Sequence, residues 1–362
     1  MMNLPQPPMG EQPTPPRRQA LPEEPTRDCR KPRLAVVLGD PAGIGPELVA
    51  RLLAAPGTLQ QAEILLIADR GELERGMEVA GLHTPYRLAR SAADADFPPG
   101  EPVLLDYRGD TQGPFERAVA TEKGGRYCLD TLSQAIGITQ RGDADAILFA
   151  PLNKNSMHQA GMHTSDELHW FAQQLGFDGP VCEFNVLDGL WTSRVTSHVA
   201  LKDVAARITR EGVADGVELI HRALVRGGAA RPRIAVCGLN PHNGDNGSFG
   251  REEIDVIGPA VEALRAQGVA VDGPFPADTI FLKVQGAQRQ YDGVVTMYHD
   301  QGQIAMKLMG FWKGITVQGG LPIPILTPAH GTAFDIEGQG KAHPGAMLAA
   351  FDLACRMATA GR

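Results

Sequence analysis

The segment RLAVVLGDPAGIGPELVARLLAA, residues 33–55, changes its hydrophobic pattern halfway along. Its first half is an uninterrupted apolar run, which is typical of a β-strand covered on both faces. A turn with Gly43 and Gly45 follows, and Pro46 then opens a stretch with apolar residues at helical spacing. A buried strand, a glycine turn and a helix are the building unit of α/β proteins, so this segment predicts that fold class.

The glycine turn has two interpretations. Free amides at the start of a helix can bind an anion. The turn lacks the G-x-G-x-x-G spacing of a dinucleotide site, so a purely structural turn is an equal alternative.

The same alternation continues along the chain. Further strands are predicted at residues 62–69, 101–107, 145–151, 193–199, 233–239 and 291–298. Helices are predicted at residues 129–142, 215–227 and 260–268. We therefore expect an α/β fold with a largely parallel or mixed sheet.

The composition indicates a globular protein with no nucleic-acid or membrane partner. With 362 residues, 43% hydrophobic and 21% charged, the chain is long enough for two lobes. Its formal net charge of -8 argues against binding to nucleic acid or to an anionic membrane, although local basic residues can still bind a small anion. No stretch approaches the roughly 18 to 20 apolar residues of a membrane span, and the N-terminus lacks the apolar core of a signal peptide.

The cysteines favour a reducing compartment. They are odd in number, widely spaced and never in a Cys-x-x-Cys pair: Cys29, Cys128, Cys182, Cys237 and Cys355. Neither a disulfide framework nor a structural zinc site is indicated, so we expect a cytoplasmic protein.

Residues 1–32 contain many prolines and few large apolar side chains. Such a composition cannot bury enough surface to offset the entropy of ordering, so we expect a disordered tail. The segment PTPP within it is a weak signal for a partner that binds proline-rich sequence.

The segment YHDQGQIAMKLMGF, residues 298–311, places charged side chains beside apolar ones. Gly302 interrupts the pattern, so His299 and Asp300 are expected on a loop or a helix entry. Lys307 lies inside the apolar part, where an ammonium group needs an anionic neighbour or substrate. Four apolar residues are expected to be buried beyond the glycine: Ile304, Met306, Leu308 and Met309. The alternative is that His299 is an ordinary core or helix-end residue.

Two further histidines follow predicted strands. His198 lies at the end of the run at 193–199, and His242 lies in GLNPHNGDNGSFGREE, residues 238–253, after the strand at 233–239. Polar loops at a sheet edge are where α/β proteins place their sites. Three imidazoles form a suitable set of divalent metal ligands if these strand ends converge, which spacing alone does not decide.

A second polar loop, HGTAFDIEGQGKAHP at residues 330–344, is punctuated by glycines. Glycine allows the backbone to approach a ligand closely. The alternative is a plain surface loop.

Taken together, the ordered motifs of the chain resemble those of the 4-hydroxythreonine-4-phosphate dehydrogenase family of vitamin B6 synthesis. They are GDPAGIGPE (39–47), APLNK (150–154), GLNPH (238–242), PADT (276–279), YHDQG (298–302), GLP (320–322) and HGTAFDI (330–336). The resemblance implies a homodimer of two-lobed α/β subunits with an isopropylmalate/isocitrate dehydrogenase-like fold and an active site in the interlobe cleft. It divides the chain into a cofactor-side lobe, 33–158 plus 303–362, and a lobe for metal, substrate and dimerisation, 159–302.

The resemblance also implies a chemistry. Members of the family oxidise the secondary alcohol of a 3-hydroxy acid with NAD or NADP, and the resulting 3-oxo acid loses carbon dioxide. The implied ligands of a divalent metal (Zn, Mg, Mn or Co) are His198, His242 and His299, with His299 reaching in from the partner subunit.

The remaining implied roles concern protons, substrate and cofactor. Lys307 would contact the substrate, and Asp278 and Asp300 would carry protons or support the metal ligands. The dinucleotide would lie along Gly331, Thr332, Ala333, Asp335 and Ile336. No arginine stands there to meet a 2'-phosphate, which favours NAD over NADP.

The family's phosphate-binding residues are changed in this chain. Thr316 stands where the family has an asparagine and Ile325 where it has an arginine, and isoleucine cannot bind a phosphate. The family's Gly-His-Thr-Glu segment aligns either with His163 and Thr164 or, without a gap, with the pair Glu167-Leu168.

The resemblance therefore leaves the small anionic hydroxy-acid substrate open. An unphosphorylated acid such as a carboxylated aromatic cis-dihydrodiol, 4-phosphohydroxy-L-threonine, and four-carbon phosphorylated sugar acids (4-phosphothreonate or 4-phosphoerythronate) all remain. A member that binds ligand without turnover is a further alternative.

Overall fold

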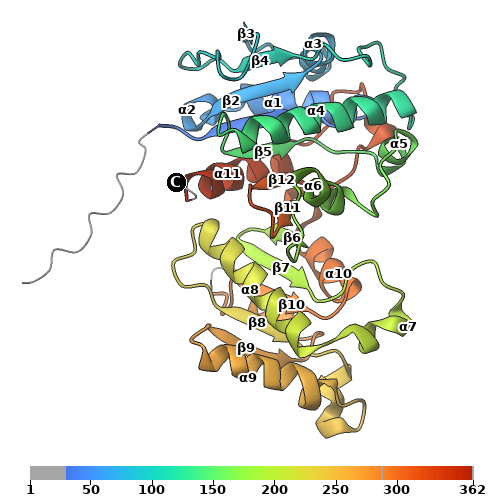
Figure 1. Cartoon of the computed structure of the whole chain (residues 1–362), viewed down its shortest axis with the longest axis vertical. Coiled ribbons are helices and arrows are strands. Elements are labelled where there is room, and N and C mark those ends of the chain that lie inside the picture. The colour runs from blue at the N-terminus through green and yellow to red at the C-terminus, as the bar shows by residue number, and fades with distance from the viewer. Residues whose placement is uncertain (1–29, 287, 361–362) are drawn as a thin grey trace, which may run out of the picture. The chain divides into compact units, whose positions relative to one another are not determined.

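The strands of the chain form one mixed sheet. In the computed structural model, which describes residues 30–286 and 288–360, twelve strands lie in the order β3-β4-β2-β1-β5-β12-β11-β6-β7-β10-β8-β9 (Figure 1). Their bounds are β1 Arg33–Val37, β2 Glu63–Ala68, β3 Arg87–Ala89, β4 Val103–Asp106, β5 Ala146–Phe149, β6 Cys182–Leu187, β7 Leu190–Arg194, β8 Ile234–Cys237, β9 Val271–Phe275, β10 Gly293–Thr296, β11 Ile315–Gly319 and β12 Ile325–Pro328. The expected α/β fold is confirmed.

Helices alternate with these strands along the chain. Their bounds are α1 Gly45–Ala54, α2 Thr58–Gln61, α3 Arg70–Ala80, α4 Glu122–Gln140, α5 Lys154–Gln159, α6 Glu167–Leu175, α7 Leu201–Val204, α8 Arg210–Arg226, α9 Gly258–Ala266, α10 His299–Gly310 and α11 Gly345–Thr359. Several begin at a side chain that accepts a hydrogen bond from a first-turn amide, as helix N-caps do. These caps are Asp69, Thr121, Asp166 and Thr209, before α3, α4, α6 and α8.

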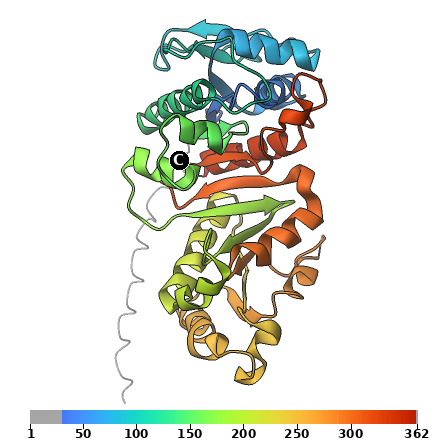
Figure 2. The same cartoon turned by 90° about the vertical axis from the view of Figure 1, so that its right-hand side faces the viewer.

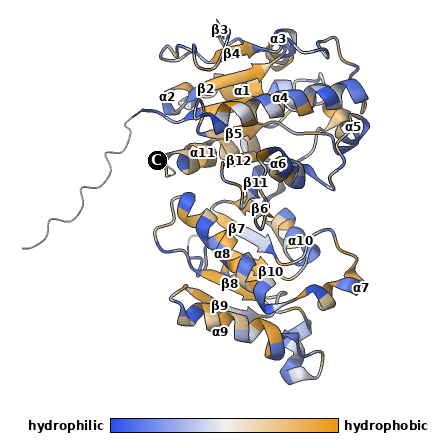
Figure 3. Cartoon of the chain, in the orientation of Figure 1, coloured by the Kyte–Doolittle hydropathy of each residue, from blue (hydrophilic) through white to orange (hydrophobic). Residues whose placement is uncertain are grey.

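The first strand is covered on both faces, as its uninterrupted apolar sequence predicts. Leu34 and Val36 belong to one hydrophobic cluster with Leu48 of α1, whereas Ala35 and Val37 belong to another cluster, to which α4 contributes. Figure 3 shows the consequence, since the strands of this part are coloured as hydrophobic while the helices carry both colours. Burial of both faces therefore explains the missing alternation in RLAVVL.

The glycine turn after β1 has a structural explanation. A Cβ atom on Gly45 would lie 2.0 Å from the carbonyl oxygen of Leu38, and one on Gly43 would lie 2.7 Å from Thr332. The amide of Ile44 donates to the carbonyl of Thr332 at 3.1 Å. Close packing therefore requires both glycines. The amide of Ile44, which was a candidate for anion binding, is hydrogen-bonded to the loop at 330–344 instead.

Strand direction brings three predicted loops to one edge of the sheet. β10 pairs in parallel with β7 on one side and with β8 on the other. The carboxyl ends of the three strands therefore lie together, and His198, His242 and His299 follow those ends. Such an edge is where α/β proteins place their sites.

The middle of the sheet is formed by strands from the last part of the chain. β11 pairs antiparallel with both β12 and β6, and β12 pairs in parallel with β5. Figure 2 shows orange β11 beside yellow-green β6. The cavity described below opens on the face of β6 and β11 that carries Asn185 and Thr316, which are paired residues.

Some predicted boundaries differ from the structure. The strand expected at 193–199 is β7, which begins at Leu190 and ends at Arg194, because the following residues leave the ladder to reach His198, whose φ is 41°. Ile304 and Leu308, expected in the core, are 59% and 84% exposed, so that prediction was wrong. Met306, at 6%, is buried as expected.

The expected N-terminal tail lies outside the described residues, apart from residues 30–32. Among the helices of the described part, none has the length and apolar character needed to cross a membrane.

Candidate active site

A cavity of about 210 Å³ contains four of the residues that the sequence singled out. It is lined by His198, His299, Lys307 and Thr316, which come from the loop after β7, from α10 and from β11. Residues far apart in the chain therefore meet at one place. The cavity is small and mostly polar in its side chains, which suits a small hydroxy acid better than an extended apolar ligand.

One face of α10 supplies polar and ionisable side chains to the wall of this cavity. His299, Gln303 and Lys307 are spaced by four residues, so their side chains follow one another along the helix, and all three line the cavity. Gly302 and Met306 are on the buried face. This geometry explains why a lysine stands in an apolar run: it faces the cavity and solvent rather than the core.

The imidazoles of His198 and His299 lie close together, with ring centroids 5.9 Å apart. Nδ1 of His198 is 3.3 Å from Oδ2 of Asp166, and Nδ1 of His299 is 2.7 Å from Oδ1 of Asp300. A carboxylate at Nδ1 fixes a histidine's tautomer and leaves Nε2 free to bind a metal. The pair therefore fits a divalent metal on the chemistry of its donor atoms.

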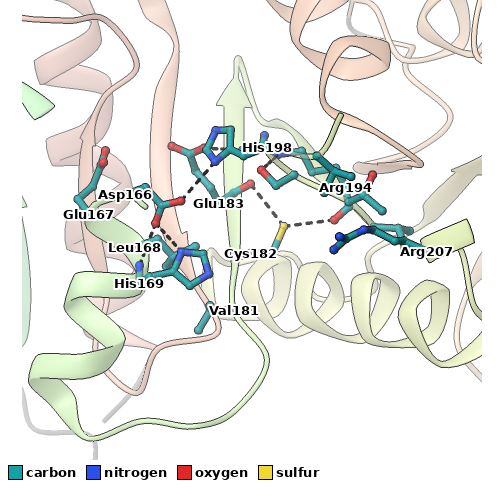
Figure 4. Close-up of a pocket in the computed structure, with 14 residues that line it drawn as sticks. Asp166, Glu167, Leu168, His169, Val181, Cys182, Glu183, Arg194, His198 and Arg207 are labelled. Atoms are coloured by element: carbon teal, nitrogen blue, oxygen red, sulfur yellow. Dashed lines mark hydrogen bonds and ion pairs between the residues drawn. The ribbon is translucent and has the colours of Figure 1, made fainter. Parts of the chain in front are cut away.

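Asp166 is shared between two histidines and the start of a helix. It accepts from the backbone amide of His169 at 3.0 Å, and its Oδ1 is 2.6 Å from Nδ1 of the same residue (Figure 4). Burial alone would raise the pKa of Asp166. The hydrogen bonds from His169 and the charges of His169 and His198 outweigh it and hold the pKa below its ordinary value.

The third predicted metal ligand stands apart from this pair. His242 is exposed in the short helix η2, Pro241–Gly247, and has a φ of 55°. Within residues 30–286 and 288–360 no group of three histidine, cysteine, aspartate or glutamate side chains is arranged to hold a metal. Adjacent strands bring His299 to His198, whereas His242 does not join them in a group of three among the described residues.

The loop that carries His242 has a strained backbone that is held by hydrogen bonds. Its residues 242–246 all have positive φ, between 42° and 74°. The carboxylate of Glu253 accepts from the amides of Leu239 and Asn240, both at 2.7 Å, and Asn243 donates to the carbonyl of Pro274 at 2.8 Å. Strain of this kind persists only where surrounding contacts impose it, and it commonly marks a binding loop.

The cavity has a polar wall that sequence reasoning missed. Glu183 and Asn185 on β6, with Gln303 on α10, line it. The signal was present in CEFNVL, residues 182–187, where polar and apolar residues alternate as in a half-buried strand. No strand was predicted there, because this segment contains none of the glycine and histidine motifs on which the sequence interpretation was based.

An adjoining cavity of about 360 Å³ shares Glu183 and His198 with the first (Figure 4). Asp166, Glu167 and His169 line it, whereas His163 is exposed and the hydroxyl of Thr164 donates to the carbonyl of Asp166. Of the two alignments with the family's Gly-His-Thr-Glu segment, the one without a gap has its Glu167 on a cavity wall, whereas His163 and Thr164 of the other do not line the cavity.

Glu167 is paired with a lysine of the first cavity. Its Oε2 lies 3.1 Å from Nζ of Lys154. Burial would lower the pKa of Lys154, but the carboxylates of Glu167, Glu183 and Asp166 outweigh it and raise that pKa, so the lysine stays protonated.

Two other predicted substrate positions differ from one another. Thr316 lines the cavity, 5% exposed. Ile325 begins β12, is fully buried in a hydrophobic cluster and does not reach the cavity lining. Asp278 is exposed in the loop after β9, and Asp300 is exposed beside His299.

The predicted cofactor loop lies against the glycine turn after β1. Thr332 contacts that turn as described above, and Ala333 has a φ of 45° before the short helix η6, Phe334–Ile336, which contains Asp335. Gly331 has open space around it, since a Cβ there would meet nothing within 4 Å. The motifs GDPAGIGPE and HGTAFDI are thus neighbours in the fold.

Comparisons with known proteins agree with this arrangement. Residues 60–354 match the family described as Pyridoxal phosphate biosynthetic protein PdxA. A Pseudomonas aeruginosa protein named Putative 4-hydroxythreonine-4-phosphate dehydrogenase 2 is 63% identical over 90% of this chain and 97% of its own length. The D-threonate 4-phosphate dehydrogenase of Pectobacterium atrosepticum is 36% identical over 90% and 99%.

Solved structures agree as well. The 4-hydroxythreonine-4-phosphate dehydrogenase of Klebsiella pneumoniae superposes with a TM-score of 0.79 at 33% identity, over 92% of this chain and 99% of that one. A terephthalate 1,2-cis-dihydrodiol dehydrogenase from Burkholderia xenovorans gives a TM-score of 0.64 at 27% identity, over 90% and 98%. Fold, motifs and relatives coincide over most of the described residues, and the chain therefore belongs to the PdxA family.

Proposed function

We propose that this chain is an NAD(P)-linked dehydrogenase that oxidises the secondary alcohol of a phosphorylated 3-hydroxy acid, with loss of carbon dioxide from the product. The observation that carries the proposal is the convergence of His198, His299 and Lys307 on one small cavity. The relatives named 4-hydroxythreonine-4-phosphate and D-threonate 4-phosphate dehydrogenase support an oxidation at a CH–OH carbon of a four-carbon phosphorylated acid.

In this proposal His198 and His299 hold a divalent metal through Nε2, with His242 of a second copy as third ligand. The metal, when bound, acts as a Lewis acid for the hydroxyl being oxidised. Asp166 and Asp300 keep the two imidazoles in the tautomer that can bind it.

The other proposed roles belong to residues of the same cavity and its neighbour loop. Lys307, two helical turns from His299, holds a substrate oxygen and transfers a proton as the product forms. Lys154 and Lys307 are the cationic groups of the cavity wall and would bind the acid's anionic ends. Asp278 is exposed in the loop after β9 and is proposed as a further proton carrier.

The dinucleotide is proposed to lie along the loop of Gly331 and Thr332, where the backbone is open to an approaching ligand. The same proposal assigns residues 33–158 and 303–362 to the cofactor side, and 159–302 to the metal side. NAD is favoured because Asp335 and Ile336 offer no positive charge to a 2'-phosphate.

A homodimer is part of the proposal because the metal set needs a third histidine. On α10 an exposed apolar stripe flanks the catalytic face: Ile304 and Leu308, four residues apart, are 59% and 84% exposed. Exposed apolar stripes next to a functional site commonly mark an interface.

The test is NAD and NADP reduction followed at 340 nm with added Mn²⁺, Zn²⁺ or Mg²⁺. The substrates are D-threonate 4-phosphate, 4-phosphohydroxy-L-threonine and a carboxylated aromatic cis-dihydrodiol. Oxidation of a phosphorylated acid that stops with a chelator supports the proposal. Oxidation of the diol alone would move the chain to the chemistry named for the Burkholderia relative, and no oxidation of any of the three would contradict an enzyme of this class.

A further inference from the structure

A separate cavity of about 330 Å³ lies where the C-terminal end of α8 meets α11 and the end of β11 (Figure 1). Its volume is at the lower end of the range for small-molecule sites, which is about 300 to 1,000 Å³. It shares no lining residue with the two cavities described above, and the proposed dehydrogenase reaction uses none of its side chains. The ligand of this cavity must therefore be inferred from its own lining.

The charged side chains that line this cavity are both cationic. Arg222 and Arg226 are four residues apart on α8, so their side chains are neighbours on the surface of the helix. Among the described residues no aspartate or glutamate lines the cavity, although the whole chain has a formal net charge of -8. The electrostatic environment of the cavity therefore favours an anion and opposes a cation.

The guanidinium of Arg226 is oriented by neutral groups. Its Nε donates to the carbonyl of Met357 at 3.3 Å, and its Nη1 donates to the carbonyl of Pro322 at 3.2 Å. Partial burial lowers the pKa of Arg226, and no carboxylate in the described part of the chain forms an ion pair with it. The arginine is thus held in place while its charge stays without a counter-charge and its Nη2 stays without a hydrogen-bond partner within the same residues.

Arg222 adds a second cationic group of the same kind. It is exposed, and within residues 30–286 and 288–360 its guanidinium forms neither an ion pair nor a hydrogen bond. Arginine binds carboxylate and phosphate oxygens through paired N–H groups. Two such groups on one wall of a cavity can therefore bind one oxyanion together.

A buried amide at the end of β11 also lines the cavity. Gln318 is 3% exposed, and among the residues that the structure describes neither its Oε1 nor its Nε2 has a hydrogen-bond partner. Buried polar groups are almost always hydrogen-bonded, so an unpartnered amide on a cavity wall points to a polar ligand atom. The Nε2 group of Gln318 can donate to the same kind of oxygen that the two guanidinium groups bind.

Most of the remaining wall is apolar. Its side chains come from the loop after α6, from α8, from the segment between β11 and β12 and from α11: Phe177, Leu219, Leu321, Ile323 and Met357. A hydrated inorganic ion would leave these side chains uncovered. Burial of apolar surface on both partners instead favours a ligand with an apolar body.

We propose that this cavity is a second ligand site, which binds a small amphipathic anion. A carboxylate or phosphate head group accepts hydrogen bonds from Arg222 and Arg226, and a ring or branched chain packs against Phe177 and the other apolar side chains. A neutral ligand would leave the two positive charges unpaired, and a cation would be repelled. The site does not depend on the proposed function, since none of its residues belongs to the proposed active site.

The test is calorimetric titration of the full-length chain, freed of divalent metal by a chelator and without cofactor or hydroxy acid. The probes are phenyl phosphate, benzoate, inorganic phosphate and benzyl alcohol. We expect phenyl phosphate or benzoate to bind at least about tenfold more tightly than inorganic phosphate and benzyl alcohol, because only the first two combine an anionic head with an apolar body. The tighter of the two identifies the head group that the site prefers.

Variants place the binding in this cavity. Arg222→Met and the double variant Arg222→Met/Arg226→Met remove the charges and keep apolar length, and we expect the double variant to bind the preferred probe at least about tenfold more weakly. Arg231→Met is the matched control, since Arg231 is exposed in the loop before β8 and does not line the cavity. Lys307→Met, in the proposed active site, should bind the probe as the unchanged chain does.

Four results would overturn the proposal. They are no saturable binding of either amphipathic anion below about 10 mM, benzyl alcohol or inorganic phosphate binding as tightly as both, unchanged affinity in both arginine variants, and loss of binding in Lys307→Met. Thermal unfolding of each variant shows that the proteins compared are folded. If the double variant does not fold, Arg222→Met decides alone, because that side chain has no partner to lose within the described residues. Failure of the proposed dehydrogenase reaction would leave these results unaffected, since none of them requires turnover.

Discussion

Oδ2 of Asp166 lies 3.3 Å from Nδ1 of His198, and this contact joins the first turn of α6 to the loop after β7. The same carboxylate accepts from the amide of His169 and so also caps the helix. A single side chain therefore fixes both a helix terminus and the orientation of a proposed metal ligand.

Asp166→Ser separates these two roles, because serine caps a helix but offers no carboxylate to His198. We expect the variant to fold and to bind Mn²⁺ or Zn²⁺ about 10- to 100-fold more weakly. Calorimetric titration of metal-free protein measures the affinity. Asp69→Ser, which changes the cap of α3 in the same way, is the control. Equal metal affinity in Asp166→Ser and the unchanged protein would show that the contact does not support a metal ligand.

Lys307→Met keeps most of the side chain's length and removes its charge. We expect kcat/KM to fall about 10²- to 10⁴-fold, the usual contribution of a positioned proton-transfer group. Steady-state NAD reduction measures it. Lys313→Met is the control, since Lys313 is exposed in the short helix η5 and lies 3.7 Å from Asp188. Loss of the same size in both variants would point to a general effect of charge.

Mixing two inactive variants tests whether His242 comes from a second copy. His242→Ala and His299→Ala should each be inactive. Refolded together, they form heterodimers in which one site carries both lesions and the other carries none, so about a quarter of all sites should be intact. Recovery of activity near that level supports a shared site, whereas continued inactivity of well-folded mixed dimers would place all three histidines in one chain.

Leu308→Glu tests the apolar stripe of α10 as the dimer interface. A carboxylate that must be buried opposes association strongly, so we expect the variant to sediment as a monomer over a range of concentrations. Leu88→Glu is matched in chemistry, because Leu88 is also exposed, at 51%, but lies on the edge strand β3. A dimer that persists in Leu308→Glu would remove the stripe from the interface.

Asp40 predicts a dependence of stability on pH. It is fully buried, and burial raises its pKa even though Ala42 and Ser156 donate hydrogen bonds to it. A carboxyl whose pKa is raised on folding contributes stability that is complete below its unfolded pKa, near 3.8, and is lost as the pH rises through the folded value.

Asp40→Asn removes this titration while keeping both hydrogen-bonding positions. Relative to the unchanged chain, the variant should gain stability as the pH is raised from about 4 to 8, and denaturant unfolding at several pH values measures the difference. Asp110→Asn, at an exposed loop position, should follow the unchanged chain. A constant difference over this range would contradict the raised pKa.

The sequence predicted those parts of the fold where one local pattern determines the structure. RLAVVL is uniformly apolar because β1 is covered on both faces, and Gly45 is required because Leu38 lies against it. The convergence of His198 and His299 also followed from strand ends, once β7 and β10 proved to be neighbours.

The unpredicted parts depend on contacts between distant segments. Ile304 and Leu308 are residue types that are typical of a core, and only the position of α10 in the fold leaves them exposed. The polar wall was missed because it depends on a hydrogen bond from Arg194 on β7 to Asn185 on β6, and the sequence does not show which strands are neighbours. The resemblance places Ile325 at a position where the family binds substrate, but this residue belongs to β12 and its side chain lies in the hydrophobic core.

The order of strands has a consequence for how the protein is made. β12 and β11, which stand between β5 and β6 in the finished sheet, are synthesised after every other strand. While the ribosome is still adding residues up to Pro328, β5 and β6 each present an unpaired backbone edge. The nascent chain thus carries two edges that can join a neighbouring polypeptide, and slow elongation late in the message would lengthen the period in which chaperones must cover them.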